Sequence, residues 1–120
     1  MSDRRRHLGS QGEEAAARYL QADGYTILGR NLRLGHDEID LVARKQDLLV
    51  FVEVKTRTSS SFAYPEDSVT MHKRIRMLAA AERYLDEHPE CPESWQFDVI
   101  AVEGDPQRDP VITHFENVLS

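Results

Sequence analysis

The chain has 120 residues, 40% of them hydrophobic and 30% charged, with a formal net charge of -6, which suits one folded domain rather than two. Its single cysteine excludes an internal disulfide, a cysteine-rich zinc site and a paired-cysteine redox motif. No apolar run approaches the roughly 20 residues of a membrane span and no signal peptide follows the first arginines, so we expect a cytoplasmic protein with no membrane partner.

The charge is unevenly distributed along the chain. Residues 1–77 hold 13 of the 15 basic and 11 of the 21 acidic residues, a balance of +2, whereas the remainder carries -8. Phosphate binding draws on lysine and arginine, so the first part is compatible with a nucleic-acid partner in spite of the overall charge. Acidic C-terminal portions also serve solubility alone.

The first element in chain order is a helix. Residues 1–8 are polar and basic, which predicts a flexible arm ahead of one domain at 9–120. Ser10 and Glu13 have the spacing of a capping box, and the apolar stripe that follows ends at Gly24. We therefore expect a helix over residues 10–23.

Three strands are predicted next, over residues 25–34, 38–44 and 48–56. The short connection at Lys45–Asp47 makes the last two an antiparallel hairpin. A loop of even length, such as Gln46-Asp47, makes the paired residue numbers sum to 93 and places Asp40 opposite Glu53. An odd-length loop would send these two carboxylates to opposite faces.

A serine-rich stretch over residues 57–67 predicts a surface loop, and a long helix should follow at 69–87. The stripe predicted at helical spacing is Met71, Ile75, Leu78, Ala79, Glu82 and Leu85, in which only Glu82 is polar. Two more strands are expected at 96–102 and 111–115.

The second hairpin strand ends its apolar run with Glu53 and Lys55, which share one strand face. Asp40 and Glu53, if opposite, would repel each other unless a cation lies between them. Mg²⁺ prefers a few carboxylate oxygens together with water and phosphate, so the two acids suit an incomplete magnesium site. Lys55 could stabilise charge that develops on phosphorus. The alternative is a solvated Glu–Lys pair.

Asp40 followed by Glu53-Val54-Lys55 resembles the PD-(D/E)xK nuclease superfamily. That resemblance implies an α/β fold of the restriction-endonuclease-like class, with a mixed central sheet flanked by helices in the order α-β-β-β-α-β-β. More closely, residues within about 9–102 resemble the uncharacterised YraN-type family, which is similar to archaeal Holliday junction resolvases. The matching residues are Gly12-Glu13, Tyr19-Leu20, Gly24-Tyr25, Arg30-Asn31, Glu38-Ile39-Asp40-Leu41, Phe51-Val52-Glu53-Val54-Lys55-Thr56-Arg57, Lys73 and Phe97-Asp98-Val99.

The resemblance implies that Asp40, Glu53 and Glu13 bind Mg²⁺ or Mn²⁺ and that Lys55 is the catalytic lysine. For Glu13 a structural capping role is equally compatible with the sequence. The chain departs from the family pattern at Asp37, where glycine is usual, and this adds a carboxylate beside the site.

Three further cations are candidates for substrate binding. Arg57 shares a strand face with Lys55 and could grip a phosphate. Lys73 and Arg76 lie in the first turns of the long helix, where the helix dipole disfavours cations, and an anion bound there would remove the anomaly. A solvated surface is the alternative for all three.

The leading hypothesis is a Mg²⁺-dependent nuclease that hydrolyses DNA, with branched or structured DNA as a candidate substrate. A resolvase-like role would call for a homodimer. One alternative is a non-catalytic nucleic-acid-binding module with the same fold. Another is an acidic protein–protein adaptor.

Overall fold

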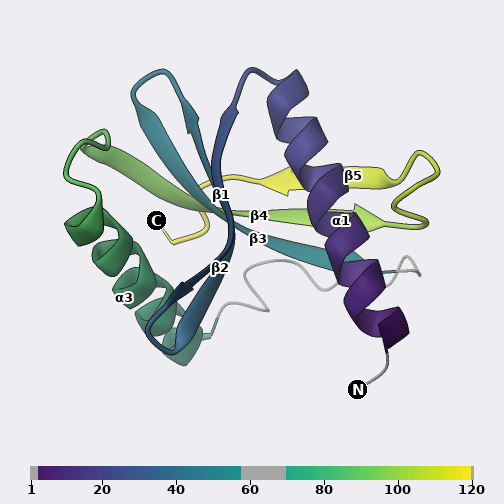
Figure 1. Cartoon of the computed structure of the whole chain (residues 1–120), viewed down its shortest axis with the longest axis horizontal. Helices are drawn as coiled ribbons and strands as arrows, with labels where there is room; N and C mark the ends of the chain where they lie inside the picture. Colours follow the sequence, from purple (N-terminus) through teal and green to yellow (C-terminus); the bar gives the residue numbers. More distant parts are fainter. Residues whose placement is uncertain (1–2, 58–69, 120) are drawn as a thin grey trace.

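The structure, a computed structural model, describes residues 3–57 and 70–119, with side chains from residue 10 onward. The loop predicted over 57–67 lies outside these residues except for Arg57. Seven elements follow one another along the chain (Figure 1): α1 (Asp3–Ala22), β1 (Thr26–Leu34), β2 (Asp37–Lys45), β3 (Leu48–Arg57), α3 (Met71–Glu87), β4 (Ser94–Glu103) and β5 (Val111–Phe115). The predicted order α-β-β-β-α-β-β is confirmed.

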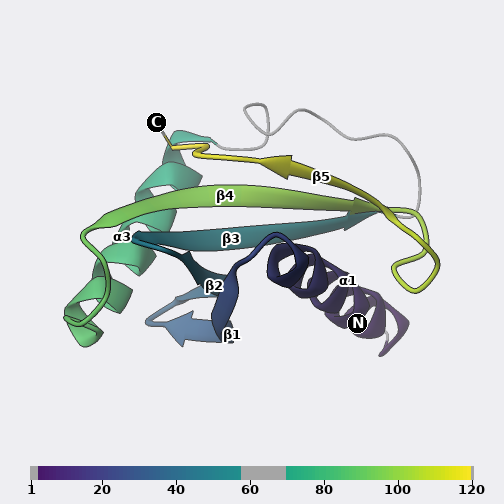
Figure 2. The same ribbon diagram turned by 90° about the horizontal axis from the view of Figure 1, so that it is seen from above.

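The five strands form one mixed sheet in the order β1-β2-β3-β4-β5. The neighbours β1/β2, β2/β3 and β4/β5 are antiparallel, and β3/β4 is parallel. The parallel pair requires a crossover, and α3 lies on the chain between its two strands. The long strands β3 and β4 run side by side through the middle of the molecule (Figure 2).

The two helices cover opposite faces of the sheet (Figure 1), and each face has its own apolar core. On the α1 face, Leu20 packs with Leu41, Val50 and Val52. On the α3 face, Phe51 packs with Met77, Ala81, Tyr84 and Phe97 among others. Alternate side chains of β3 therefore pack into different cores, because successive side chains of a strand point to opposite faces of the sheet.

The first helix differs from its prediction. It begins at Asp3 rather than at residue 10, so most of the stretch predicted as a flexible arm has helical backbone. Arginine is a good helix former, which makes the basic stretch compatible with a helix. Ser10 therefore lies inside the helix and cannot be its N-cap, so the capping-box alternative for Glu13 is wrong. The helix ends as predicted, with Gly24 at φ 93°.

The buried face of α3 also differs from its prediction. Met71 is 73% exposed and Ile75 60% exposed, whereas Met77, Ala80, Ala81 and Tyr84 are buried. Small alanines let the helix approach the sheet closely, and the Tyr84 ring packs edge-on against Phe51. Periodicity identified the helix correctly, but it did not distinguish between two apolar stripes on its surface.

Candidate active site

The site is built on the β2–β3 hairpin, whose register is as predicted. Lys45 pairs with Leu48, and the pairs continue to Leu41 and Val52, with residue numbers that sum to 93. The turn holds Gln46 at φ 55°, a left-handed backbone conformation that is uncommon for a residue other than glycine. An even-length turn therefore keeps Asp40 and Glu53 on the same face of the sheet.

The ladder ends one step before these two carboxylates, which corrects the expectation that Asp40 pairs directly with Glu53. After Val52 the next residue of β3, Glu53, is aligned with Val99 of β4, and the pairs with β2 do not continue. The Val54 amide donates a hydrogen bond of 2.8 Å to Asp40 Oδ2. The Asp40 side chain thus takes the place of a strand partner where β2 leaves β3.

On its other side Asp40 lies opposite Asn31 of β1. The pairs on either side, Arg30 with Leu41 and Leu32 with Ile39, fix this position. Asn31 has φ 51°, and its side chain is close enough to Glu13 of α1 to favour the ionised form of that carboxyl. Burial raises the pKa of Glu13, and the negative charge of Glu38 adds to the rise, while Asn31 and Arg30 oppose it. Glu13 is therefore brought to the edge of the same acidic cluster.

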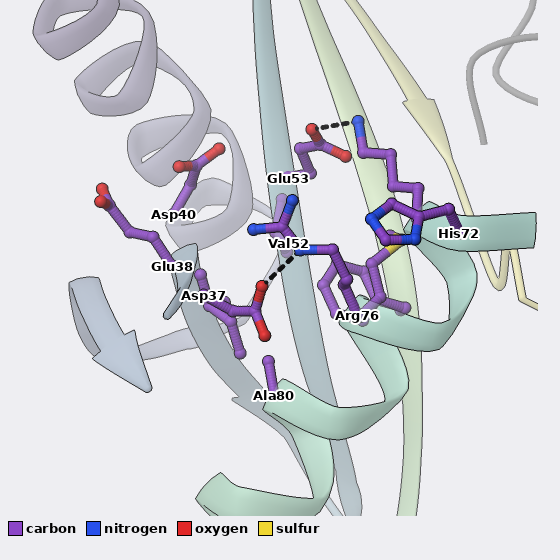
Figure 3. Close-up of a pocket in the computed structure, with 12 residues that line it drawn as sticks. Asp37, Glu38, Asp40, Val52, Glu53, His72, Arg76 and Ala80 are labelled. Carbon is purple, nitrogen blue, oxygen red and sulfur yellow. Dashed lines mark hydrogen bonds and ion pairs between the residues drawn. The ribbon is translucent and has the colours of Figure 1, made fainter. Parts of the chain in front are cut away.

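Asp40 and Glu53 line one pocket of about 460 Å³ between the sheet and the first turns of α3 (Figure 3). Its wall combines carboxylates from β2 and β3 with cations from α3 and an apolar floor. The lining residues are Asp37, Glu38, Ile39, Asp40, Val52, Glu53, His72, Lys73, Arg76, Met77, Ala80 and Phe97. The fold thus brings the two predicted metal ligands Asp40 and Glu53 into one pocket. Two predicted substrate-binding residues, Lys73 and Arg76, line the same pocket.

The two oxygens of Glu53 have different surroundings. Oε1 lies 2.7 Å from Lys73 Nζ, marked by the dashed line at Glu53 in Figure 3, and 3.9 Å from Lys55 Nζ. Oε2 is buried and has no hydrogen-bond partner among the described residues. An unpartnered carboxylate oxygen inside a protein is costly, and a cation in the pocket would satisfy it.

Asp40 is the group whose ionisation the fold changes most. Burial raises the pKa of Asp40 from 3.8 to about 6, the negative charges of Glu13, Glu53 and Glu38 add to the rise, and the hydrogen bond from Val54 opposes it. No described cation forms an ion pair with Asp40 within 4.0 Å. The site thus has excess negative charge close to Asp40.

Burial also lowers the pKa of Lys55. The charges of Lys73 and Arg57 lower it further, and only Glu53 opposes the change. Lys55 is 20% exposed, so its ammonium group lies at the margin of the site and not in free solvent. A lysine with this environment is suited to interact with an anion, which would stabilise its charged form.

Of the predicted substrate-binding arginines, Arg76 lines the pocket and Arg57 is not among its lining residues. Arg76 Nε donates a 2.7 Å hydrogen bond to Asp37 Oδ1 (Figure 3), so the unusual Asp37 is a partner of a predicted substrate-binding arginine. Arg57 is exposed at the end of β3, where its Nη1 donates to the Thr56 carbonyl. Sequence reasoning missed the role of Asn31, although its place in the family pattern was a signal.

A second group of potential metal ligands lies on the α1 face of the sheet. Asp98, His114 and Glu116 offer ligand atoms within 4.8 Å of one another and could hold a metal ion. The buried Asp98 already accepts hydrogen bonds from Gln96 and the Asn117 amide, and its Oδ2 lies 2.6 Å from His114 Nε2. The Asp98 oxygens are thus satisfied without an ion, unlike Glu53 Oε2.

Comparison with known proteins places the candidate site within a matched region. Residues 12–102 match the model of the uncharacterised protein family UPF0102. The UPF0102 protein of Pelotomaculum thermopropionicum is 46% identical, over 98% of both chains, and that of Parafrankia sp. is 45% identical, over 89% of this chain and 91% of the relative. The structure of Pyrococcus furiosus SfsA in complex with Ca²⁺ has a TM-score of 0.38 and 14% identity, and the match covers 93% of this chain and 63% of SfsA.

Proposed function

The chain belongs to the UPF0102 family, whose description names no activity, and we propose from its site that it is a divalent-metal-dependent nuclease. This is the YraN-type family of the sequence resemblance. The observation that carries the proposal is the buried, unpartnered Glu53 Oε2 in a pocket shared with Asp40. The proposed reaction is the hydrolysis of phosphodiester bonds in DNA.

The residues present fit a magnesium or manganese ion. Asp40 and Glu53 supply carboxylate oxygens, which are the ligands that Mg²⁺ prefers, and Glu13 adds a third carboxylate at the edge of the cluster. A divalent ion would neutralise the excess negative charge that raises the pKa of Asp40. When bound, such an ion would supply Lewis-acid polarisation of the phosphate and a water nucleophile at neutral pH.

The protein's own residues then perform the remaining tasks. Lys55 stabilises negative charge that grows on the phosphoryl oxygens, because it lies beside Glu53 on the same strand face. Arg76 and Lys73 line the pocket from α3 and bind a backbone phosphate. Arg57, exposed at the end of β3, extends this cationic surface along the strand.

The test is cleavage of labelled duplexes, flaps and four-way junctions with Mg²⁺ or Mn²⁺. Glu53→Gln and Lys55→Met should each lower the cleavage rate by about 100-fold or more, since each removes one electrostatic contribution. Glu87→Gln, which changes an exposed glutamate at the end of α3, is the matched control and should cleave at the wild-type rate. Cleavage that is unchanged in both site variants would refute the proposal.

Absence of cleavage on every substrate would also refute it. Salt-dependent binding without product would then identify a non-catalytic nucleic-acid-binding module, and absence of both would favour an adaptor.

A further inference from the structure

Two lysines share one oxygen of Glu53, and they come from different elements. Lys55 belongs to β3 and its Nζ lies 3.9 Å from Glu53 Oε1, whereas Lys73 belongs to α3 and its Nζ lies 2.7 Å from the same atom. The shorter contact is a hydrogen bond between charged groups, which are the stronger kind. Glu53 therefore already has a cation at one of its two oxygens.

The position of Lys73 in α3 is unfavourable apart from this contact. Thr70 is the N-cap, and its side chain accepts a hydrogen bond from the Lys73 amide at 3.2 Å, so Lys73 is in the first turn of the helix. No acidic residue occupies that turn. The dipole disfavours a cation there. Lys55 and Lys73 also repel each other, which is one cause of the lowered pKa of Lys55.

We propose that Lys73 is the resident counter-ion of Glu53, that it would leave this carboxylate on binding of a divalent ion, and that its ammonium group would then bind a phosphate of the nucleic acid. This inference rests on the proposed function. The geometry supports displacement, because a divalent ion at Glu53 would stand close to an ammonium group that is only 2.7 Å from the same carboxylate. Like charges at such separations repel strongly in a partly buried site.

Lys73 rather than Lys55 is the lysine that can leave. The Lys73 side chain lines the pocket from α3, next to the exposed His72, and is 31% exposed, while the Lys55 side chain on β3 is 20% exposed. A four-carbon side chain on an exposed turn can swing toward solvent without moving the backbone. Lys73 therefore moves between two anionic partners, the Glu53 carboxylate and a phosphate, while Lys55 stays beside the reacting group.

The experiment is a calorimetric titration of the protein with Mn²⁺ in the absence of nucleic acid. Lys73→Met should bind Mn²⁺ about fivefold more tightly than wild type, which corresponds to removing an ion pair worth about 1 kcal/mol. Lys73→Arg keeps the competing charge and should stay close to wild type. Lys45→Met is the matched control, because it removes a lysine paired with Asp23 at the end of β2, and should leave Mn²⁺ affinity unchanged.

The second measurement is binding of a duplex in Ca²⁺, where Lys73→Met should bind several-fold more weakly than wild type and Lys45→Met. Weaker Mn²⁺ binding by Lys73→Met would overturn the inference and identify Lys73 as a residue that only orients Glu53. Lys73→Ala should repeat the gain, which excludes an effect peculiar to methionine. If the wild type binds Mn²⁺ through Asp40 but cuts nothing, the proposed function fails, and the titration still decides the role of Lys73.

Discussion

Asp40 combines two roles that oppose each other. Its carboxylate ends the β2–β3 ladder by accepting a hydrogen bond from Val54, which favours the fold. Its charge is buried among other carboxylates, which raises its pKa to about 6. A residue that is retained at such a cost is a candidate for function, since perturbed pKa values cluster at active sites.

The raised pKa makes the stability of the metal-free protein depend on pH. The folded chain binds the Asp40 proton more tightly than the unfolded chain, whose pKa for this group is near the ordinary 3.8. The resulting stabilisation is fully present below pH 3.8 and is lost as the pH rises through about 6. At pH 8 Asp40→Asn should therefore raise the free energy of unfolding, by about 1–3 kcal/mol.

Urea unfolding in the presence of a chelator measures this difference. The gain should shrink when the pH is lowered to 5, since wild-type Asp40 then becomes protonated in the folded state. Glu14→Gln is the control, and it should lower the free energy of unfolding at pH 8 instead of raising it. The reason is that the hydrogen bond and charge of Arg30 lower the pKa of Glu14. A gain that is equal at both pH values would contradict the assignment of buried charge to Asp40.

At the scale of elements, the contact between α1 and β3 decides where Glu13 lies. Gly12 faces Thr56 so closely that a Cβ at this position would overlap Thr56 Oγ1 and lie 3.1 Å from Thr56 Cβ. The absence of a side chain thus lets the helix lie directly on the strand that carries Glu53 and Lys55. The next residue of α1, Glu13, can then reach Asn31 and the acidic cluster.

Gly12→Ala should lower the free energy of unfolding by about 1–3 kcal/mol, the usual cost of overpacking. This sign identifies close packing, because replacing glycine by alanine at an uncrowded helix position would instead raise the free energy of unfolding by about 1 kcal/mol. Urea unfolding of Gly12→Ala, Thr56→Ala and the double variant forms a complete cycle. The double variant should recover part of the loss, and strictly additive effects would show that the two side chains are not in contact.

The helices and strands could be predicted from the sequence more completely than the contacts between them. Strand alternation and an even-length turn are local signals, and they predicted the hairpin register to the last pair, Leu41 with Val52. The contact of Lys73 with Glu53 depends on how α3 is rotated on the sheet, and the predicted stripe of Met71, Ile75 and Leu78 implied a different rotation. Ladder termination at Asp40 was also unpredictable, because β2 beyond Leu41 stays paired with β1 while β3 stays paired with β4, and strand alternation does not show where the two hairpin strands separate.

For the whole molecule, the question is how a chain with a net charge of -6 could bind a polyanion. The described structure gathers Lys55, Lys73 and Arg76 around one pocket, with Arg57 farther along β3. The same pocket holds the carboxylates of Asp37, Glu38, Asp40 and Glu53, so the local surface could become cationic only where a divalent ion neutralises them. No helix in the described part of the chain is long and apolar enough to cross a membrane.

If this surface binds nucleic acid through its backbone, Arg57→Gln should weaken binding to unrelated duplex sequences to a similar extent. The slope of log affinity against log salt concentration should decrease by about 1, the expectation for one lost phosphate contact. Fluorescence anisotropy in Ca²⁺ at several salt concentrations measures both quantities. Arg44→Gln, at the opposite end of the β2–β3 hairpin, should leave the slope unchanged, and a slope unaffected by Arg57→Gln would place the binding surface elsewhere.

The end of the β2–β3 ladder gives the site a natural spectroscopic reporter. The Val54 amide proton is bound by Asp40 Oδ2 itself and not by a strand neighbour. Its chemical shift and its exchange with solvent deuterium are therefore tied to whether that carboxylate is charged, protonated or engaged by a cation. The amide signal of Val54 should therefore report whether a cation occupies the pocket, without a probe attached to the protein.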